Sequence, residues 1–458
     1  MSTPTFSPAA EPALWARSAS ELNALYAAGQ ATPEDALSSV LERLEAVNPA
    51  LNAVIALDRA GALAAARAST ERWRAGTPLS PLDGVPVSVK DNILQQGLPA
   101  TWGSRLYRDF VPQRDETPVA RLRATGALLF GKTNVPEFTL QGYTDNLLFG
   151  VTGNPFDPTL TPGGSSGGAV AAVAAGIGPI ALGTDGGGSI RRPAGYAGLF
   201  GLKPSRGLVP RAHGFPTILH DFEVAGPLAR TVADIQLTLS VIADGFAPAA
   251  VTAPLRILFA PTFGAAPVDP EIAASLEEAA RQFEAMGHSV ERAEPFLLAE
   301  PMLDIWPVVS QTAAAAVMEE HPGQDHLIAP ALAEMVRQGA ARSATEYLGA
   351  LNRITAMGRE FDALFARHDI LLTPAAAALP WPAHELYPTQ IAGRPVGPRG
   401  HAVFTPFANV LGLPGLSIPV RPSATGLPIG AQIVGPHGSD ARLLALAAAF
   451  GEVPRSSA

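Results

Sequence analysis

The chain has 458 residues, 47% of them hydrophobic and 16% charged, a balance that excludes a disordered protein and indicates a large core. Its formal net charge of −9 argues against nucleic acids and anionic membranes as main partners. The absence of cysteine excludes disulfides, thiolate metal sites and a cysteine nucleophile.

The N-terminal region lacks a basic segment followed by an apolar core, so we expect no signal peptide. The longest apolar stretch, residues 169–183, is interrupted by Gly176, Gly178 and Pro179 and is too short to span a bilayer. We therefore expect this stretch to be buried core, and the protein to be a cytoplasmic enzyme with no membrane partner.

Helix signals dominate the first part of the chain after a Pro- and Ala-rich segment, residues 1–15, that we expect to be loose. Residues 18–21 match a capping box, and Thr32-Pro33 is a second helix start. Asn48-Pro49 is expected to end this second helix. An Ala-rich helix is expected over residues 58–74.

Short strands and helices alternate over the rest of the chain. Strands are expected at residues 85–90, 127–131, 180–183, 257–260, 370–373, 416–420 and 429–434. Helices are expected at residues 117–125, 170–175, 231–243, 270–286, 351–365 and 441–450, with a mostly helical stretch over 296–345. Residues 201–204 are expected to break the chain, and residues 379–400 to form a Pro/Gly-rich loop.

The alternation of strands and helices indicates an α/β protein. We find no internal repeat, charged tract or long linker that would divide the sequence. We therefore expect a single large domain over residues 1–458, with a more mobile segment near residues 290–400.

Two serines lie in glycine-rich turns, Ser165 within residues 163–168 and Ser189 directly after three glycines at 186–188. A glycine run permits a backbone concavity whose N–H groups can stabilise an oxyanion. The turns lack the Gly-Lys-Ser/Thr of a nucleotide P-loop and give no good match to a dinucleotide fingerprint. The turns are also compatible with a simple helix start or a flexible loop. A serine nucleophile with its oxyanion donors, however, explains why both serines lie in glycine-rich turns.

A serine nucleophile needs a base. Residues 163–167 formally match the G-x-S-x-G elbow of histidine-based hydrolases, but the residues before them make a poor strand. Lysine occurs only at positions 90, 132 and 203, and of lysine and arginine only lysine readily becomes neutral. Lys90 ends an apolar strand, where burial would lower its pKa. We therefore predict Lys90 as the base, the alternative being a surface lysine at a strand end.

Several dispersed motifs, in one consistent order, resemble those of the amidase signature hydrolases. They are Gly84–Asp91, Gly131–Phe138, Pro162–Gly168, Gly183–Ala194, Phe404–Asn409, Gly412–Pro414 and Gly426–Gly430. The resemblance covers nearly the whole chain. It implies a central twisted mixed β-sheet covered by helices on both faces, and hydrolysis of amide C–N bonds through an acyl-enzyme without a metal or organic cofactor.

The resemblance also implies roles for individual residues. Ser189 would be the nucleophile, Ser165 a bridging serine on a cis peptide, and Lys90 the base. The oxyanion hole would consist of Gly186, Gly187, Gly188 and the amide of Ser189. Asp185, Arg191, Gly164 and Ser166 would support these groups, and Lys132 and Lys203 would be structural.

The substrate pocket is expected to consist of less regular segments rich in apolar and aromatic residues. The candidates are Tyr143, Leu147, Leu148, Phe149, Phe215, Ile218, Trp381 and Tyr387. For any one of them, ordinary packing is an equal alternative. Together they favour a small aryl or alkyl amide as the substrate, with carbamates or urethanes as further possible substrates. The resemblance is also compatible with a homodimer.

Two alternatives stay open at this point. One is the glutaminase component of a tRNA-dependent amidotransferase, which would need a charged pocket for which Arg211, Arg394 or Arg399 are available. The other is a catalytically inactive binding relative, which the intact set of Lys90 and two serines disfavours.

Overall fold

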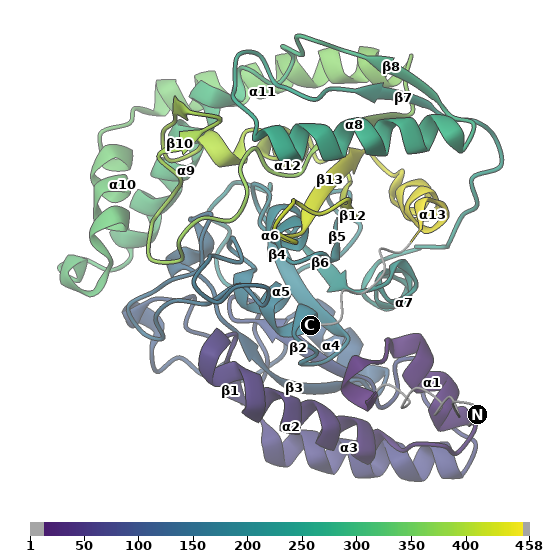
Figure 1. The fold of residues 1–458 in the computed structure, drawn as a ribbon. Helices are drawn as coiled ribbons and strands as arrows, with labels where there is room; N and C mark the ends of the chain where they lie inside the picture. Colours follow the sequence, from purple (N-terminus) through teal and green to yellow (C-terminus); the bar gives the residue numbers. More distant parts are fainter. Residues whose placement is uncertain (1–12, 452–458) are drawn as a thin grey trace, which may run out of the picture.

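The computed structural model describes residues 13–451, which fold around one large mixed β-sheet (Figure 1). Its 11 strands lie in the order β1-β3-β2-β4-β6-β5-β12-β13-β9-β7-β8. The strands are β1 (Val54–Leu57), β2 (Pro86–Lys90), β3 (Leu128–Thr133), β4 (Ile180–Asp185), β5 (Phe200–Lys203), β6 (Val224–Ala229), β7 (Arg256–Phe259), β8 (Ser289–Arg292), β9 (Ile370–Pro374), β12 (Gly415–Val420) and β13 (Ile429–Val434). The pairs β2–β3, β2–β4, β7–β8 and β7–β9 are parallel, whereas the other pairs are antiparallel.

Helices cover both faces of this sheet (Figure 1). They are α1 (Ala19–Ala27), α2 (Pro33–Leu51), α3 (Arg59–Arg74), α4 (Thr117–Ala124), α5 (Gly167–Ala174), α6 (Arg191–Tyr196), α7 (Val232–Ile242), α8 (Pro270–Ala285), α9 (Met302–Glu319), α10 (Pro330–Ala340), α11 (Ala344–Phe365), α12 (Pro406–Val410) and α13 (Asp440–Phe450). No helix of the described residues is long and apolar enough to cross a membrane.

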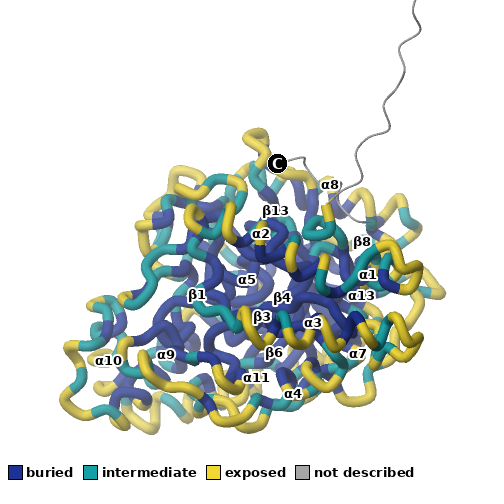
Figure 2. The backbone as a smooth tube through the Cα atoms, turned by 90° about the horizontal axis from the view of Figure 1, so that it is seen from below, coloured by how far each residue is buried: buried dark blue, intermediate teal, exposed yellow. Residues whose placement is uncertain are grey.

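The alternation of side chains along the strands places neighbouring residues in different hydrophobic clusters on the two faces of the sheet. In β3, Leu129 packs into the core beneath α4, α7, α8 and α13. Its neighbours Leu128 and Phe130 pack on the opposite face, against α2, α3 and α5. Figure 2 shows that buried residues fill the interior around β3, β4 and α5, while exposed residues lie on the outer helices and loops.

The prediction that Asn48-Pro49 ends the second helix is wrong by one turn. Helix α2 continues through Pro49 to Leu51, and Asn52 then takes the left-handed conformation with φ 49°. Asn48 Oδ1 accepts hydrogen bonds from the Ala53 and Val54 amides, both at 2.9 Å. The chain therefore leaves the helix at Asn52, held by the Asn48 side chain.

The prediction of a chain break at residues 201–204 is also wrong, because residues 200–203 form strand β5. A Cβ on Gly201 would lie 2.7 Å from the Ala194 Cβ of α6. This glycine therefore permits a close approach of α6 to the sheet and does not end the strand. Strand β6 was not predicted, because its Gly226 and Pro227 weaken the strand pattern.

The two irregular regions have different outcomes. Residues 1–12 of the expected loose segment lie outside the described residues, and Leu14–Ala16 form a short 3-10 helix. Residues 379–400 are mostly loop, as predicted, with a small hairpin of β10 (Gln390–Ile391) and β11 (Arg394–Pro395). A 3-10 turn, Gly400–Ala402, follows.

Candidate active site

The parallel strands β2 and β4 end side by side and bring Lys90 next to Thr184. The Lys90 Nζ donates hydrogen bonds to Ser165 Oγ at 2.8 Å, Thr184 Oγ1 at 2.8 Å and the Thr184 carbonyl at 3.2 Å. These three acceptors match the three protons of a charged amine. Loss of one proton therefore requires a hydroxyl to reverse its hydrogen bond and donate to the nitrogen.

Burial accounts for the state of the Lys90 amine. The side chain is fully buried, and this burial lowers the pKa of Lys90 to about 7, against the opposing effect of the Glu223 and Asp185 carboxylates. At neutral pH a substantial fraction of the amine is consequently neutral and able to accept a proton.

The other two lysines of the chain are buried as well. Lys132 Nζ donates to the carbonyls of Asp91 and Ile93, and Lys203 Nζ donates to the Pro204 carbonyl. Within the described residues, neither lysine forms a hydrogen bond with the serine turns. Both therefore hold backbone segments, in agreement with the structural roles assigned to them.

Ser165 follows a cis peptide bond from Gly164, as the resemblance implies. A Cβ on Gly164 would collide with the Tyr143 carbonyl oxygen, so only glycine fits there. Ser166 precedes α5, and its Oγ donates to the Thr184 carbonyl at 3.2 Å. These contacts fix the first serine turn against the end of β4.

The two serine turns lie directly against each other. The Ser166 amide donates to the Ser189 carbonyl at 3.1 Å. Among the hydrogen bonds of residues 13–451, none joins the Ser165 and Ser189 hydroxyls. The Ser189 residue is 6% exposed and Ser165 is 1% exposed, so of the two Ser189 is the more accessible from outside.

Asp185 and Arg191 brace the Ser189 turn from within. The Asp185 carboxylate accepts from Gly188 N at 2.6 Å, from Ile190 N at 3.1 Å and from Arg191 Nε at 3.0 Å. Burial alone would raise the pKa of this carboxyl, but the Arg191 guanidinium holds it well below its usual range. Asp185 is therefore a permanent anion that pins both ends of the turn.

Three of the four expected oxyanion donors are free. The amides of Gly186, Gly187 and Ser189 donate no hydrogen bond within the described part of the chain. The Gly188 amide already donates to Asp185, so its prediction as an oxyanion donor is corrected. Its φ of 112° indicates a conformational role instead, because that value suits glycine.

Two hydrophobic side chains pack against the glycines that carry two of the free amides. A Cβ on Gly186 would lie 2.6 Å from the Leu219 side chain, and a Cβ on Gly187 would lie 2.6 Å from the Trp306 ring. The glycines at these positions therefore allow Leu219 and Trp306 to approach the turn closely. A low-dielectric covering of this kind strengthens amide donors toward a developing negative charge.

The predicted substrate residues divide into three groups. Tyr143 and Trp381 are buried in one cluster with Tyr196, beside Gly164. Phe215 stacks on Trp102 with centroids 4.6 Å apart, and Ile218 packs on the same core as Trp306.

The third group, Leu147 and Phe149, forms no hydrogen bond with the triad among the described residues. Leu147 is 38% exposed, and the Phe149 carbonyl accepts from Asn52 at the end of α2. Both residues precede the first serine turn in sequence, and their role in substrate binding stays a prediction.

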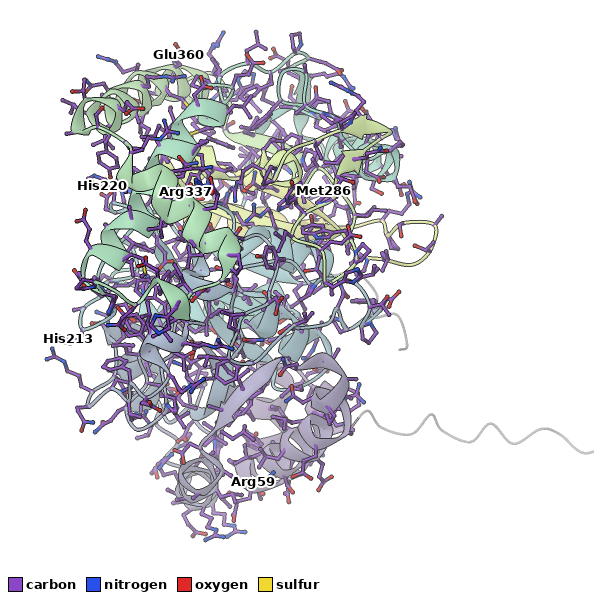
Figure 3. The ribbon with its side chains drawn as sticks, turned by 90° about the vertical axis from the view of Figure 1, so that its left-hand side faces the viewer. Arg59, His213, His220, Met286, Arg337 and Glu360 are labelled. Atoms are coloured by element: carbon purple, nitrogen blue, oxygen red, sulfur yellow. The ribbon has the colours of Figure 1, made fainter. Side chains whose placement is uncertain are left out.

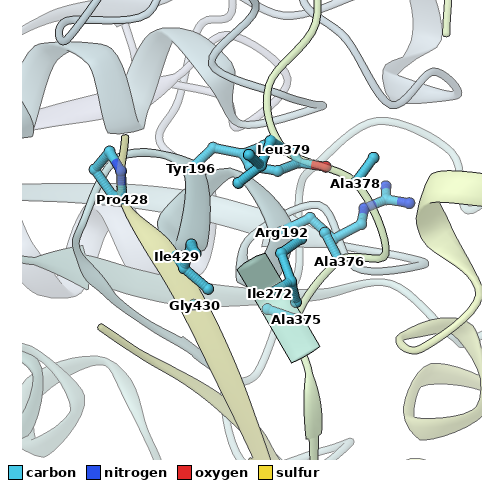
Figure 4. Close-up of a pocket in the computed structure, with 11 residues that line it drawn as sticks. Arg192, Tyr196, Ile272, Ala375, Ala376, Ala378, Leu379, Pro428, Ile429 and Gly430 are labelled. Carbon is cyan, nitrogen blue, oxygen red and sulfur yellow. The ribbon is translucent and has the colours of Figure 1, made fainter. Parts of the chain in front are cut away.

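A small cavity lies beside α6, the helix that follows Ser189 (Figure 4). Its volume is about 10 Å³, and Arg192, Tyr196, Ala376, Leu379 and Gly430 are among its lining residues. This volume matches about one water molecule and excludes an amide substrate.

Several residues of the site were missed in the sequence analysis. Thr184 supplies two acceptors to Lys90, and Trp306 packs against Gly187. Arg192 donates to the Gly164 carbonyl at 3.3 Å. The role of Thr184 could have been predicted, because Thr184 directly precedes Asp185 at the end of a predicted strand. The role of Trp306 could not, because Trp306 is 117 residues from Ser189 in the sequence.

Histidine does not replace lysine at this site. His213 and His220 lie in the loop between β5 and β6, and both are exposed at the periphery of the molecule (Figure 3). Among the described residues, no group of three or more His, Asp or Glu side chains is placed to hold a metal ion.

Comparisons with known proteins give the family and the fold of the chain's relatives. The family model described as Amidase matches residues 35–444. The chain is 32% identical to an acylamidase of Rhodococcus erythropolis over 95% of each chain. It is 33% identical to a glutamyl-tRNA(Gln) amidotransferase subunit of Symbiobacterium thermophilum, over 96% of this chain and 97% of that protein. The crystal structure of a bacterial aryl acylamidase of the amidase signature family is similar with a TM-score of 0.87, at 31% identity over 96% of each chain.

Proposed function

The chain belongs to the amidase family of C–N hydrolases, and from this premise we propose that it cleaves small apolar or aryl amides through an acyl-enzyme on Ser189. The observation that carries this proposal is the 2.8 Å hydrogen bond between the buried Lys90 amine and Ser165, beside the Ser189 turn.

The first half of the reaction follows from the proton inventory of the site. Neutral Lys90 takes the Ser165 proton, and Ser165 takes the Ser189 proton as Ser189 Oγ attacks the amide carbon. The Gly186, Gly187 and Ser189 amides hold the resulting oxyanion. The proton then returns through Ser165 to the leaving nitrogen, because an amine departs poorly as an anion.

The second half repeats the relay with water. Water attacks the acyl carbon, its proton passes through Ser165 to Lys90, and the Ser189–acyl bond breaks. Ser189 regains a proton by the same route and the carboxylic acid leaves. Atoms and charges balance without a further co-reactant, so one amide and one water give one acid and one amine.

The direct experiment is hydrolysis of acetanilide by the purified protein, with release of aniline measured over time. A quenched sample examined by mass spectrometry is expected to carry the acetyl group on Ser189. The Ser189→Ala variant is expected to release no aniline and to carry no adduct. An adduct on another residue, with turnover kept in Ser189→Ala, would refute the assignment.

The choice of small aryl or alkyl substrates rests on the aromatic residues near the site. Trp306 packs against Gly187, and Trp381 packs in one cluster with Tyr143 beside Gly164. Phe215 belongs to the same hydrophobic core as Trp306. A panel of anilides, aliphatic amides, esters and carbamates at equal concentration tests this choice. We expect the anilides to give the highest kcat/KM, with carbamates or urethanes as slower substrates.

A glutaminase role is a second candidate, favoured by the similarity to glutamyl-tRNA(Gln) amidotransferase subunits. Among the arginines considered for glutamine, Arg211 is engaged by Glu116 and Glu223, and Arg394 is exposed on β11. Glutaminase activity of the purified protein, measured with and without candidate partner proteins, separates this role from that of an acylamidase. An inactive relative would show neither activity and no labelling by a fluorophosphonate.

A further inference from the structure

Three buried residues and the partly exposed Arg399 have buried polar atoms without a partner. The atoms are Nε and Nη1 of Arg192, the hydroxyl of Tyr196, Nη2 of Arg399 and both ring nitrogens of His401. We call these four residues the basic cluster. Among the described residues, no acidic side chain forms a hydrogen bond or an ion pair with any member of it.

The members of the basic cluster lie close together. The Trp381 ring centroid is 6.0 Å from that of Tyr196 and 4.7 Å from that of His401. Burial lowers the pKa of His401, and the nearby positive charges of Arg192 and Arg399 lower it further. In Figure 4 the polar ends of Tyr196 and Arg192 extend toward the segment that carries Ala378. The neighbouring Ala377 amide donates to the His401 carbonyl at 3.0 Å.

The basic cluster adjoins both parts of the catalytic apparatus. Arg192 Nη2 donates at 3.3 Å to the carbonyl of Gly164, the residue before Ser165. The Arg399 guanidinium lies over the Trp306 ring, 5.2 Å from its centroid, and the same ring packs against Gly187. A single small substrate could consequently have its amide at the Ser189 turn and a second polar group at the basic cluster.

The charges of the basic cluster are not compensated by the protein. Arg192 is 2% exposed, and although burial lowers its pKa to about 10, it is a cation at neutral pH. An unpaired guanidinium is costly to bury. Guanidinium groups bind carboxylates with two parallel hydrogen bonds, which is the strongest pairing open to them here.

We propose that the basic cluster binds, at its partly exposed member Arg399, a carboxylate carried by the amide substrate, an inference that rests on the proposed function and narrows it to acidic amides. A zwitterion such as glutamine is disfavoured, because its ammonium group would lie among cations with no carboxylate to receive it. The substrate class is therefore an aryl or alkyl amide with one negative charge on its acyl or its amine part.

The test compares three anilides at one pH with the purified full chain. Acetanilide is neutral, succinanilate carries the carboxylate on the acyl part, and 4-acetamidobenzoate carries it on the amine part. We expect kcat/KM for one of the two acids to exceed that for acetanilide. In Arg399→Met the ratio of acid to neutral kcat/KM is expected to fall about 10- to 100-fold, as loss of a charge-assisted hydrogen bond implies.

Arg359→Met is the matched control, because Arg359 is an exposed arginine of α11 outside the basic cluster. It removes the same charge and is expected to leave the ratio unchanged. Equal kcat/KM for all three anilides in the unaltered protein, or an unchanged ratio in Arg399→Met, would overturn the inference. Both results leave the proposed function standing, because Ser189→Ala tests that separately.

A binding measurement on the unaltered protein tests the inference even if a variant fails to fold or the anilides are hydrolysed slowly. Phenylmethylsulfonyl fluoride labels an activated serine, and a ligand in the site protects that serine from labelling. We expect benzoate to protect Ser189 of the unaltered protein at a concentration at least about tenfold lower than benzamide. Equal protection by the two compounds would contradict a carboxylate site.

Discussion

Arg191 and Arg192 are neighbours on one short helix and both are buried, but their surroundings differ. Arg191 donates to Asp185, to Gln432 Oε1 at 2.6 Å and to Asn409 Oδ1 at 2.5 Å. The Arg192 side chain has one hydrogen bond within the described residues, to the Gly164 carbonyl, and two nitrogens without a partner.

The difference separates two regions of the active site. The region around Asp185 and Arg191, which holds the nucleophile turn, is saturated with protein partners and is therefore preorganised. The region around Arg192 and Arg399 has hydrogen-bond donors without a protein partner. Such donors are expected in a ligand site and not in a structural ion pair. Buried polar atoms without partners are uncommon in proteins, and six of those in the described residues belong to the basic cluster.

The largest expected effects lie in the saturated region. Ser189→Ala and Lys90→Met are each expected to lower kcat/KM for every amide by at least about 10³-fold, whether or not the substrate is charged. Ser88→Ala is the control, because Ser88 is buried in the same strand as Lys90 and its hydroxyl has no partner. If Lys90→Met lowered kcat/KM for charged amides much more than for neutral amides, or the reverse, the distinction between the two regions would be wrong.

The next effect is on stability. Arg191→Met leaves the Asp185 carboxylate buried without its counterion and is expected to lower the free energy of unfolding by about 3–5 kcal/mol. Arg192→Met removes no ion pair and is expected to cost less. Urea unfolding of both variants measures the difference. The reverse order would show that Arg192, and not Arg191, is the structural residue.

The pH dependence of activity sharpens the account of the saturated region. Because the neutral amine is the active form and burial lowers the pKa of Lys90 to about 7, kcat/KM is expected to rise about tenfold per pH unit below 7 and to level off above it. The measurement uses neutral acetanilide from about pH 5 to about pH 9, so that titration of the substrate does not contribute.

The smallest effect concerns Lys203, which has no catalytic role in this account. Burial lowers its pKa to about 7, whereas an unfolded lysine has its ordinary value of 10.5. Between these two values the unfolded chain binds more protons, so stability is expected to rise with pH through that window. Lys203→Met is expected to flatten this rise in urea unfolding at pH 7, 8 and 9, and an unaltered slope would contradict the buried amine.

Much of the saturated region could be predicted from the sequence. The strand that ends at Lys90 and the glycine turns of Ser165 and Ser189 are local patterns, and the scarcity of lysine pointed to buried amines. The resemblance then supplied the cis peptide and the bracing pair of Asp185 and Arg191. These features depend on residues close to one another in sequence or on motifs of fixed spacing.

The region that holds unused donors could not be predicted in the same way. Arg192 and Arg399 are 207 residues apart in the sequence, and Arg399 lies over Trp306 of α9, so their placement near the serine turns depends on long-range packing. The same dependence limits what the sequence says of the substrate residues, so Leu147 and Phe149 stay predictions. Gly188 is a local case, because its amide donates to Asp185, three residues before it. Hydrophobic pattern identifies apolar residues, but it does not specify which of them face the triad or which amide is already bonded.

The most direct test of the central claim is the pH dependence of covalent labelling at Ser189. The rate of labelling by phenylmethylsulfonyl fluoride, followed by mass spectrometry of the labelled peptide, reports the nucleophile without any substrate specificity. The account predicts that the label lies on Ser189, that its rate rises through a pKa near 7, and that Lys90→Met abolishes the rise. A rate on Ser189 that is independent of pH, or unaffected by loss of Lys90, would contradict it.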